Sequence, residues 1–321
     1  MFGLIYRRQD VSIRHVFFWC FCVIIEGVIL GFEMHTPLGF CTPLKGKRLD
    51  CMIKLIATDM DGTLLNDEKK IPKENIQAIK EATQAGIKIV LCTGRPMSGI
   101  LPYFNELGLT KEEYIIMNNG CSTYSTKDWQ LIDSATLTHD ELIFLEEVVK
   151  EFPNVCLTLT AENTFYAVGE EVPEIVAYDA DLVFTKAKST SLDALRNQEE
   201  IVFQAMYMGL DADVTAFQEA VEETLISKFS GVRSQDYIYE IMPQGVTKAR
   251  GLKSLIAKLG LDINQVMAIG DAPNDIELLD LVPNSVAMGN ASDEIKSRCK
   301  YITVDNNQAG VAKAIYDYAL R

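Results

Sequence analysis

Between residues 53 and 117, short apolar runs alternate with a segment of helical character, and this alternation constrains the fold more than any other feature. The runs at 53–58, 87–92 and 114–117 are apolar enough to form strands that are buried on both faces. Between the first two runs, Pro72 opens a segment with apolar residues at helical spacing, and Gly86 ends it. This order predicts the parallel sheet of an α/β fold.

The pattern changes near residue 134. Thr138 and Glu141 have the spacing of a capping box at the start of a helix. Short strands are predicted after it, at 155–160, 164–168 and 237–241. These shorter, mixed elements are typical of an inserted α+β domain.

After residue 241 the earlier rhythm returns, with a predicted helix at 247–259, a strand at 266–269 and a helix at 274–281. The fold class that follows is α/β, with a Rossmann-like parallel-sheet core and an inserted α+β cap domain. We expect the core to comprise residues 52–133 and 242–321 and the cap to comprise residues 134–241.

The first 51 residues differ from the rest, and we expect them to lie outside the fold. Residues 16–32 are nearly all apolar and follow a basic start, which is typical of a signal anchor or a short membrane span. Against a span, the run is at the lower length limit and contains Glu26. The alternatives are a buried helix, or translation that begins at Met52 behind a dispensable or artefactual segment. We favour the start at Met52 and a cytoplasmic protein, with anchoring by residues 16–32 as the alternative.

Charge and composition exclude several classes of function. The net charge is −15, so a broad basic face for nucleic acid is not expected. Among the three histidines, only His139 follows residue 51, which argues against a multi-histidine zinc site and a Ser-His-Asp enzyme. The four cysteines after residue 51 are far apart and are predicted to be small buried hydrophobic residues in a reducing compartment.

Four aspartates follow the ends of two predicted strands. Asp59 and Asp61 come after the first strand, and Asp271 and Asp275 lie in the turn after the strand at 266–269. Because ligands of parallel sheets bind outside the carboxyl ends of the strands, we expect all four carboxylates in one crevice. Such a group raises its own pKa values unless a cation neutralises it. With only oxygen ligands available, the fitting ion is Mg²⁺.

Lys248 gives a second signal, because it lies in the first turn of the helix that Thr247 opens. The helix dipole disfavours a cation at that position, so a functional reason is indicated. A phosphate held by Lys248, the Thr93 hydroxyl and backbone amides near Gly62 and Gly94 would explain it, and the alternative is a solvated surface lysine.

These residues resemble the motifs of the haloacid dehalogenase superfamily of phosphohydrolases, and the chain looks like its Cof-type subfamily, which has a large α/β cap. The matching motifs, in order, are Asp59-Met60-Asp61-Gly62-Thr63-Leu64, Thr93-Gly94-Arg95, Gly245-Val246-Thr247-Lys248 and Gly270-Asp271-Ala272-Pro273-Asn274-Asp275. The resemblance covers residues 52–321. Ala249, where the family often has glycine, and Pro273 are small departures.

The resemblance implies a role for each motif. Asp59 would be the nucleophile that forms an aspartyl-phosphate, and Asp61 would be the general acid and base. Mg²⁺ would be held by the Asp59 carboxylate, the Asp61 backbone carbonyl and Asp271, with Asp275 binding directly or through water. The phosphate site would consist of Thr93, Gly94, Lys248 and Asn274. The cap would close over the site and select the leaving group.

The predicted function is therefore a Mg²⁺-dependent phosphatase of small phosphorylated metabolites, such as sugar phosphates or nucleotide-like cofactors. A phosphomutase on the same core and a non-catalytic phospholigand-binding regulator are the alternatives. Arg95, Asn118 and Asn119 stand at strand ends and are candidates for substrate contacts, with a structural role as the alternative for each. The sequence indicates no particular substrate, cap specificity residue or oligomeric state.

Overall fold

The computed structural model describes residues 20–25, 28–34, 41–43 and 52–321, and the chain divides into two compact units, Met1–Met52 and Ile53–Arg321. In the first unit, strands β1 (Cys20–Ile25), β2 (Val28–Met34) and β3 (Cys41–Pro43) pair in that order, and both pairs are antiparallel. Residues 20–25 and 28–32 are thus strands and not the buried helix that was one alternative. The remaining residues of the 16–32 segment lie outside the described residues. Among the residues that the structure describes, no helix has both the length and the apolar character needed to cross a membrane.

An eight-stranded sheet, referred to below as the large sheet, carries the sequence motifs. Its order is β17-β16-β15-β4-β5-β6-β7-β8, parallel from β17 to β6 and antiparallel at β7 and β8. The strands are β4 (Leu55–Asp59), β5 (Lys88–Cys92), β6 (Tyr114–Met117), β7 (Ser122–Ser125), β8 (Gln130–Ser134), β15 (Val266–Gly270), β16 (Asn284–Ala287) and β17 (Tyr301–Ile302).

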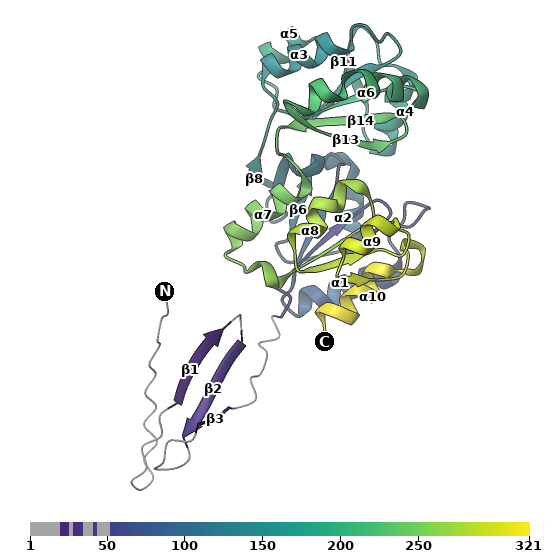
Figure 1. Cartoon of the computed structure of the whole chain (residues 1–321). Helices are drawn as coiled ribbons and strands as arrows, with labels where there is room; N and C mark the ends of the chain where they lie inside the picture. The colour runs from purple at the N-terminus through teal and green to yellow at the C-terminus, as the bar shows by residue number, and fades with distance from the viewer. Residues whose placement is uncertain (1–19, 26–27, 35–40, 44–51) are drawn as a thin grey trace. The chain divides into compact units, whose positions relative to one another are not determined.

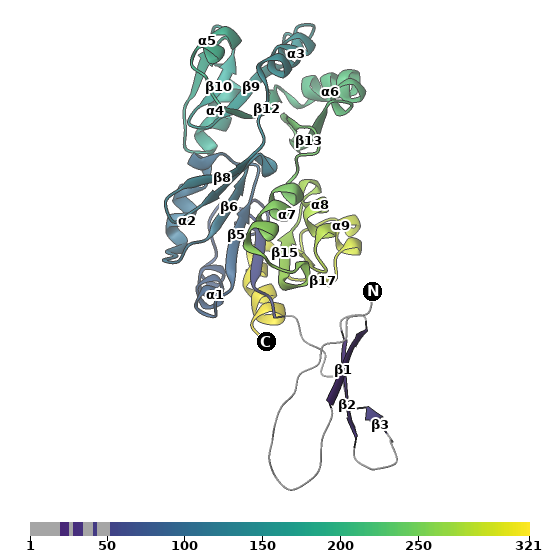
Figure 2. The same ribbon diagram turned by 90° about the vertical axis from the view of Figure 1, so that its left-hand side faces the viewer.

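Helices cover both faces of the large sheet (Figure 2). One face packs against α1 (Lys73–Gln84), α2 (Leu101–Leu107) and α10 (Gly310–Ala314), and the other against α7 (Lys248–Leu259), α8 (Ile276–Leu281) and α9 (Asp293–Arg298). Ile56 of β4 faces the first group, while its neighbours Leu55 and Ala57 face the second. Because such strands are buried on both faces, they appear in the amino-acid sequence as continuous apolar runs.

Short 3₁₀ turns follow or precede several of these elements: η1 (Met97–Gly99), η2 (Asn118–Gly120), η3 (Ile263–Gln265), η4 (Pro273–Asp275) and η5 (Asn306–Gln308). A π-helical turn, η6 (Ile315–Ala319), ends the last helix. Two of them, η2 and η4, directly follow β6 and the β15 turn, so they lie at the carboxyl ends of the parallel strands.

A six-stranded sheet, the small sheet, is built from the residues between β8 and α7. Its order is β11-β10-β9-β12-β14-β13, and all pairs are antiparallel except β10 with β11. Its strands are β9 (Cys156–Ala161), β10 (Phe165–Val168), β11 (Ala187–Thr190), β12 (Val202–Met208), β13 (Phe229–Gln235) and β14 (Ile238–Pro243). Helices α3 (His139–Val149), α4 (Glu174–Leu182), α5 (Leu192–Asn197) and α6 (Asp211–Ile226) accompany it (Figure 1).

The predicted fold class, a parallel-sheet α/β core with an inserted α+β part, is confirmed. The predicted capping box is also present, since Thr138 accepts from the Glu141 backbone amide and Glu141 accepts from that of Thr138. The strands β7, β8, β11 and β13 and the helices α2, α4 and α9 were not anticipated. The domain boundaries at residues 134 and 241 stay a prediction, because Ile53–Arg321 forms one compact unit.

Candidate active site

Two neighbouring parallel strands bring the first and the fourth motif together. β4 ends at Asp59, and its neighbour β15 ends at Gly270, directly before Asp271. Since parallel neighbours end at the same edge of a sheet, residues more than two hundred positions apart meet there. Carboxylate oxygens of Asp59, Asp271 and Asp275 all lie within 4.8 Å of one another.

Lys248 lies between two of these carboxylates. Its Nζ donates to Asp59 Oδ1 at 2.6 Å and to Asp275 Oδ1 at 2.8 Å. The α7 helix begins at Lys248, and the Thr247 hydroxyl caps it by accepting from the Arg250 amide. This cap places the lysine at the carboxyl ends of the strands.

The Lys248 side chain is 1% exposed, which makes its charge costly unless it is paired. Burial alone would lower the pKa of Lys248, but the charges of Asp275 and Asp59 outweigh burial and raise it. The lysine is therefore a fixed cation. Its unfavourable place in the first helical turn is explained by the two carboxylates that bind it.

The carboxylates carry more negative charge than Lys248 neutralises. Burial and the neighbouring charge of Asp275 raise the pKa of Asp59 well above its usual range. Burial, and again Asp275, raise the pKa of Asp271 to about 6. Three carboxylates around one ammonium leave a net negative cluster, which a divalent cation would balance.

Asp271 is held from two sides by groups in other loops. The Thr63 hydroxyl donates to its Oδ1 at 2.6 Å, and Asn290 Nδ2 donates to its Oδ2 at 3.1 Å and to the Gly62 carbonyl at 2.9 Å. Gly62 has a φ of +79°, and a Cβ there would lie 2.3 Å from Asp271 Oδ2. Glycine is thus required both by the turn and by the close carboxylate.

Asp61 is not among the three carboxylates that lie within 4.8 Å of one another, but its charge helps to raise the pKa of Asp271, so it lies near them. The expectation of four carboxylates in one crevice stays a prediction. The two oxygens of Asp61 accept from Arg95 at 2.6 and 2.7 Å, and Oδ1 also accepts from Lys69 at 2.8 Å. β4 ends at Asp59, so Asp61 lies beyond the strand, and the alternation of side chains along an extended strand does not fix its direction. Burial would raise the pKa of Asp61, but Arg95 and Lys69 lower it to about 2.

Thr93 and Gly94 directly follow β5, the other neighbour of β4. Thr93 is 2% exposed, and its hydroxyl accepts from the Arg95 amide at 3.1 Å. These residues lie at the expected sheet edge. Their role as phosphate ligands stays a prediction.

The three candidate substrate contacts all have partners within the protein. Arg95 makes the bidentate pair with Asp61. Asn118 is buried and donates to the Ser122 hydroxyl at 3.1 Å, while its side-chain oxygen has no partner among the described residues. Asn119 is buried as well, and its Oδ1 accepts from Asn274 Nδ2 at 3.3 Å.

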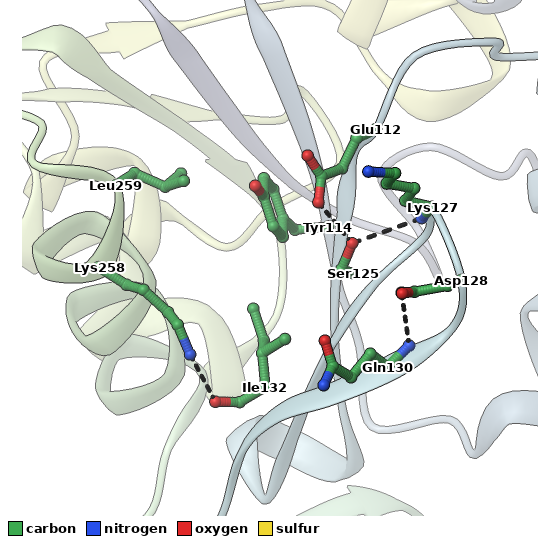
Figure 3. A pocket seen from close by; sticks show the side chains of 9 residues that line it. All are labelled: Glu112, Tyr114, Ser125, Lys127, Asp128, Gln130, Ile132, Lys258 and Leu259. Atoms are coloured by element: carbon green, nitrogen blue, oxygen red, sulfur yellow. Dashed lines mark hydrogen bonds between the residues drawn. The ribbon is translucent and has the colours of Figure 1, made fainter.

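A cavity of about 350 Å³ borders the candidate site at the carboxyl ends of the parallel strands. Lys248, Asn119 and Asn274 line it from the large sheet, and residues of β13, including Ser230 and Val232, line it from the small sheet. A second cavity of about 250 Å³ lies at the opposite, amino ends of the parallel strands, between β6, β8 and the end of α7 (Figure 3). None of the predicted site residues lines the second cavity.

The donor set at the carboxyl ends fits Mg²⁺. It offers only oxygen atoms, carries excess negative charge, and includes no histidine or cysteine ligand. Both oxygens of Asp275 are engaged, because Oδ1 accepts from Lys248 and Oδ2 accepts from two backbone amides at 3.1 Å. Both oxygens of Asp271 are engaged as well, by Thr63 and Asn290. Asp59 Oδ2 is therefore the one carboxylate oxygen of the three residues that accepts no hydrogen bond from the described residues.

Sequence reasoning missed three supporting contacts. Thr63 was quoted in the first motif without a role, although its hydroxyl position after Gly62 was a usable signal. The pairing of Asp61 with Arg95 and the contact of Asn290 with Asp271 had no signal in the sequence, because both depend on how separate loops pack.

Comparison with known proteins identifies the family. The model of the haloacid dehalogenase-like hydrolases matches residues 56–315. A protein of Streptococcus pyogenes that is named as a predicted phosphatase is 32% identical over 84% of this chain and 99% of its own. A 5-amino-6-(5-phospho-D-ribitylamino)uracil phosphatase of Bacillus subtilis is 31% identical over 85% of this chain and 99% of its own.

The solved structures agree. The crystal structure of a haloacid dehalogenase-like hydrolase from Bacteroides thetaiotaomicron has a TM-score of 0.74 and 29% identity, covering 83% of this chain and 99% of that one. The chain belongs to the haloacid dehalogenase-like hydrolases, and the names of its relatives support a phosphatase enzyme.

Proposed function

We propose that this haloacid dehalogenase-like hydrolase is a Mg²⁺-dependent phosphatase that acts through an aspartyl-phosphate. The observation that carries the proposal is the buried cluster in which Asp59 meets both Lys248 and two further carboxylates. One edge of the large sheet would thus bring together a nucleophile, a fixed cation for the phosphoryl oxygens, and a net negative site for a divalent ion. A pure binding protein has no need for the nucleophile.

Asp59 is suited to attack phosphorus. Its Oδ1 accepts from Lys248, and Oδ2 accepts no hydrogen bond from the described residues, so Oδ2 is the attacking oxygen in this proposal. A bond forms between Oδ2 and phosphorus while the bond from phosphorus to the ester oxygen breaks. Lys248 and the Thr93 hydroxyl would hold the equatorial oxygens, which is a positioning and charge-stabilising task.

Asp61 would take up a proton from solvent once Arg95 and Lys69 no longer lower its pKa, give that proton to the leaving alcohol, and then take one from the water that hydrolyses the intermediate. For this transfer its carboxyl must separate from Arg95 and Lys69, which both bind it in this structure. Arg95 is assigned to holding Asp61 before the transfer, and a direct contact of Arg95 with substrate stays a prediction.

A metal ion would be held by Asp59, Asp271 and the backbone carbonyl of Asp61, with Asp275 directly or through water. When bound, it would supply charge neutralisation for the incoming phosphate and the developing transition state. The required protein groups are present and fit this ion.

The substrate in this proposal is a small phosphorylated metabolite, a sugar phosphate or a nucleotide-like compound. The phosphatase names of the relatives support this class, and one relative is named for a phosphorylated ribitylaminouracil. Residues 134–241 would form the cap that closes over the site and selects the leaving group. The cavity of about 350 Å³ between β13 and Lys248 supports a small compound.

The test is hydrolysis of a generic aryl phosphate by the purified protein with and without Mg²⁺, followed by a panel of phosphometabolites. We expect release of inorganic phosphate that requires Mg²⁺ and stops in excess chelator. Conversion of a sugar phosphate to an isomer without phosphate release would favour the phosphomutase alternative. Full activity in excess chelator would contradict the metal-dependent mechanism.

A further inference from the structure

We propose that Glu240, in strand β14 of the small sheet, is a positioning residue that sets the orientation of two side-chain amides, Asn119 and Asn274, beside the phosphate site. The inference rests on the proposed phosphatase function and adds to it a residue that lies outside all four motifs. It acts through hydrogen bonds and does not touch the substrate.

A continuous chain of hydrogen bonds joins the small sheet to the turn that carries Asp275. Glu240 is 6% exposed, and its Oε1 accepts from the Ser234 hydroxyl at 2.8 Å. Its Oε2 accepts from Asn119 Nδ2. Asn119 Oδ1 in turn accepts from Asn274 Nδ2 at 3.3 Å.

The chemistry of the carboxylate decides which way each amide points. The oxygen and nitrogen ends of an asparagine side chain have nearly the same shape, so hydrogen-bond partners choose the orientation. An ionised carboxylate only accepts, and therefore Asn119 must present Nδ2 to Glu240 and Oδ1 to Asn274. Asn274 then has to present its own Nδ2. Without Glu240, Asn119 is free to flip and to place one donor against another.

The orientation matters because Asn119 lies against the candidate phosphate loop, Thr93-Gly94. Its backbone amide donates to the Thr93 carbonyl at 3.1 Å. A Cβ at Gly94 would lie 3.2 Å from both side-chain amide atoms of Asn119, so the amide lies directly against that glycine. Asn119 and Asn274 also line the cavity that reaches Lys248. The two amides thus face the space that a phosphorylated ligand would enter.

Glu240 has no cation within hydrogen-bond distance among the described residues. Burial raises the pKa of Glu240 to about 7, although the hydrogen bonds from Ser234 and Asn119 lower it. A buried carboxylate of this kind is costly unless its donors satisfy it. The measurements are therefore made at pH 8, where the group is ionised.

The first test compares two substitutions of Glu240 by kcat and KM for an aryl phosphate at saturating Mg²⁺. Glu240→Met keeps the volume and removes both acceptors, and we expect kcat/KM to fall roughly tenfold or more. Glu240→Gln retains an acceptor for Asn119 and should stay within about threefold of the unchanged protein. Ser234→Ala removes a donor to Glu240 but leaves Asn119 bound, and it serves as the matched control within about twofold. Equal losses in the Met and Gln variants, or no loss in a folded Met variant, would overturn the inference.

A swapped pair, in which Asn119→Asp and Glu240→Gln exchange the carboxylate and the amide, keeps the proposal testable if Glu240→Met does not fold. Asn119→Asp places two carboxylates against each other and should lower kcat/KM roughly tenfold or more. Adding Glu240→Gln restores a carboxylate–amide bond and an acceptor for Asn274, so most of the activity should return. Left-handed backbone at Asn119, with φ of 53°, is tolerated by aspartate as well. Additive losses in the double variant would overturn the inference.

Binding of inorganic phosphate separates this inference from the proposed function. If the unchanged protein hydrolyses no phosphate ester, the proposed function fails, and the same variants are compared by calorimetric titration with inorganic phosphate. We expect the Kd to rise in Glu240→Met and Asn119→Asp and to recover in the swapped pair. An unchanged Kd across the set, or no phosphate binding by the unchanged protein, would overturn the role of Glu240.

Discussion

The two ends of the large sheet each bury a carboxylate, but only the end with Asp59 gathers two further carboxylates within 4.8 Å of it among the described residues. At the carboxyl ends, Asp59 is 4% exposed, and at the amino end of β6, Glu113 is 1% exposed. Burial raises the pKa of both groups, and that of Glu113 rises to about 7. A raised pKa alone therefore does not distinguish a site from a structural group.

The surroundings of the two carboxylates differ. Glu113 Oε2 accepts from the Ile89 backbone amide at 2.6 Å, which lowers its pKa against burial, and no second carboxylate shares that bond. In the cavity beside it, polar groups satisfy each other: Ser125 donates to Glu112, and Lys258 donates to the Ile132 carbonyl (Figure 3). Asp59, by contrast, shares one lysine with Asp275 and lies beside Asp271. Excess negative charge, and not burial, distinguishes the end of the sheet that carries the proposed active site.

The largest expected effect is that of Asp59→Asn. The variant keeps the shape and removes the nucleophile, so aryl phosphate hydrolysis with Mg²⁺ should fall by about 10³-fold or more. Initial rates of phosphate release measure it. Full activity in the Asn variant would show that Asp59 is not the nucleophile and that the two sheet ends do not differ as proposed.

Lys248→Ala should be the next in size. It removes the cation between Asp59 and Asp275, and we expect a loss of roughly 10²-fold or more, as for removal of one transition-state charge donor. Steady-state rates at saturating Mg²⁺ check this, with circular dichroism to confirm folding. A loss under about threefold would mean that Lys248 does not hold the transferring phosphoryl group.

Lys69→Ala should change kcat/KM by less than about threefold. Its bond to Asp61 is made in solvent, since the Lys69 side chain is 55% exposed, and such pairs contribute about 0–1 kcal/mol. Lys70→Ala removes the neighbouring exposed pair with Glu68 and is the matched control. If only the Lys69 variant loses more than about tenfold in the same assay, Lys69 belongs to the catalytic machinery.

Glu113→Gln should leave hydrolysis within about twofold, because this carboxylate lies at the other end of the sheet. Its effect is on stability. Burial raises the pKa of Glu113 from 4.5 to about 7, so the folded state binds the proton more tightly. The stability from this group is fully present below pH 4.5 and is lost as the pH rises through 7.

Urea unfolding at pH 5 and pH 8 measures this contribution. The fall in the free energy of unfolding between the two pH values should be smaller in Glu113→Gln than in the unchanged protein. Glu112→Gln removes the adjacent, less buried carboxylate and is the control. An identical fall in Glu113→Gln and the unchanged protein would show that Glu113 is not protonated in the folded state at pH 5.

The sequence was sufficient for the parts of the fold that follow from local pattern. β4, β5 and β15 are buried on both faces and are therefore visible as apolar runs, and the acids at their ends follow from parallel topology. Strand β13 was missed because its Ser-Gly-Val-Arg-Ser stretch is mostly polar and has a single apolar residue, and helix α4 was missed because it is short with few buried residues.

Side-chain direction after a strand was harder to predict. Asp61 lies beyond the end of β4, and its carboxylate accepts from Arg95 and Lys69, two partners that the sequence pattern did not indicate. The role proposed for Glu240 also had no signal, because it depends on the hydrogen bond from Asn119, which lies 121 residues away in the sequence. Contacts of this kind depend on how two sheets meet.

The most direct test of the account is calorimetric titration of the unchanged protein, Asp271→Asn and Asp61→Asn with Mg²⁺. If the turns after β4 and β15 hold one divalent ion between them, the titration should show one Mg²⁺ bound per chain. Asp271→Asn should then lower the affinity for Mg²⁺ roughly tenfold or more. Asp61→Asn should bind nearly as well, because only its backbone carbonyl is assigned to the ion. Equal affinity in the unchanged protein and Asp271→Asn, or no binding of Mg²⁺ by the unchanged protein, would contradict the account.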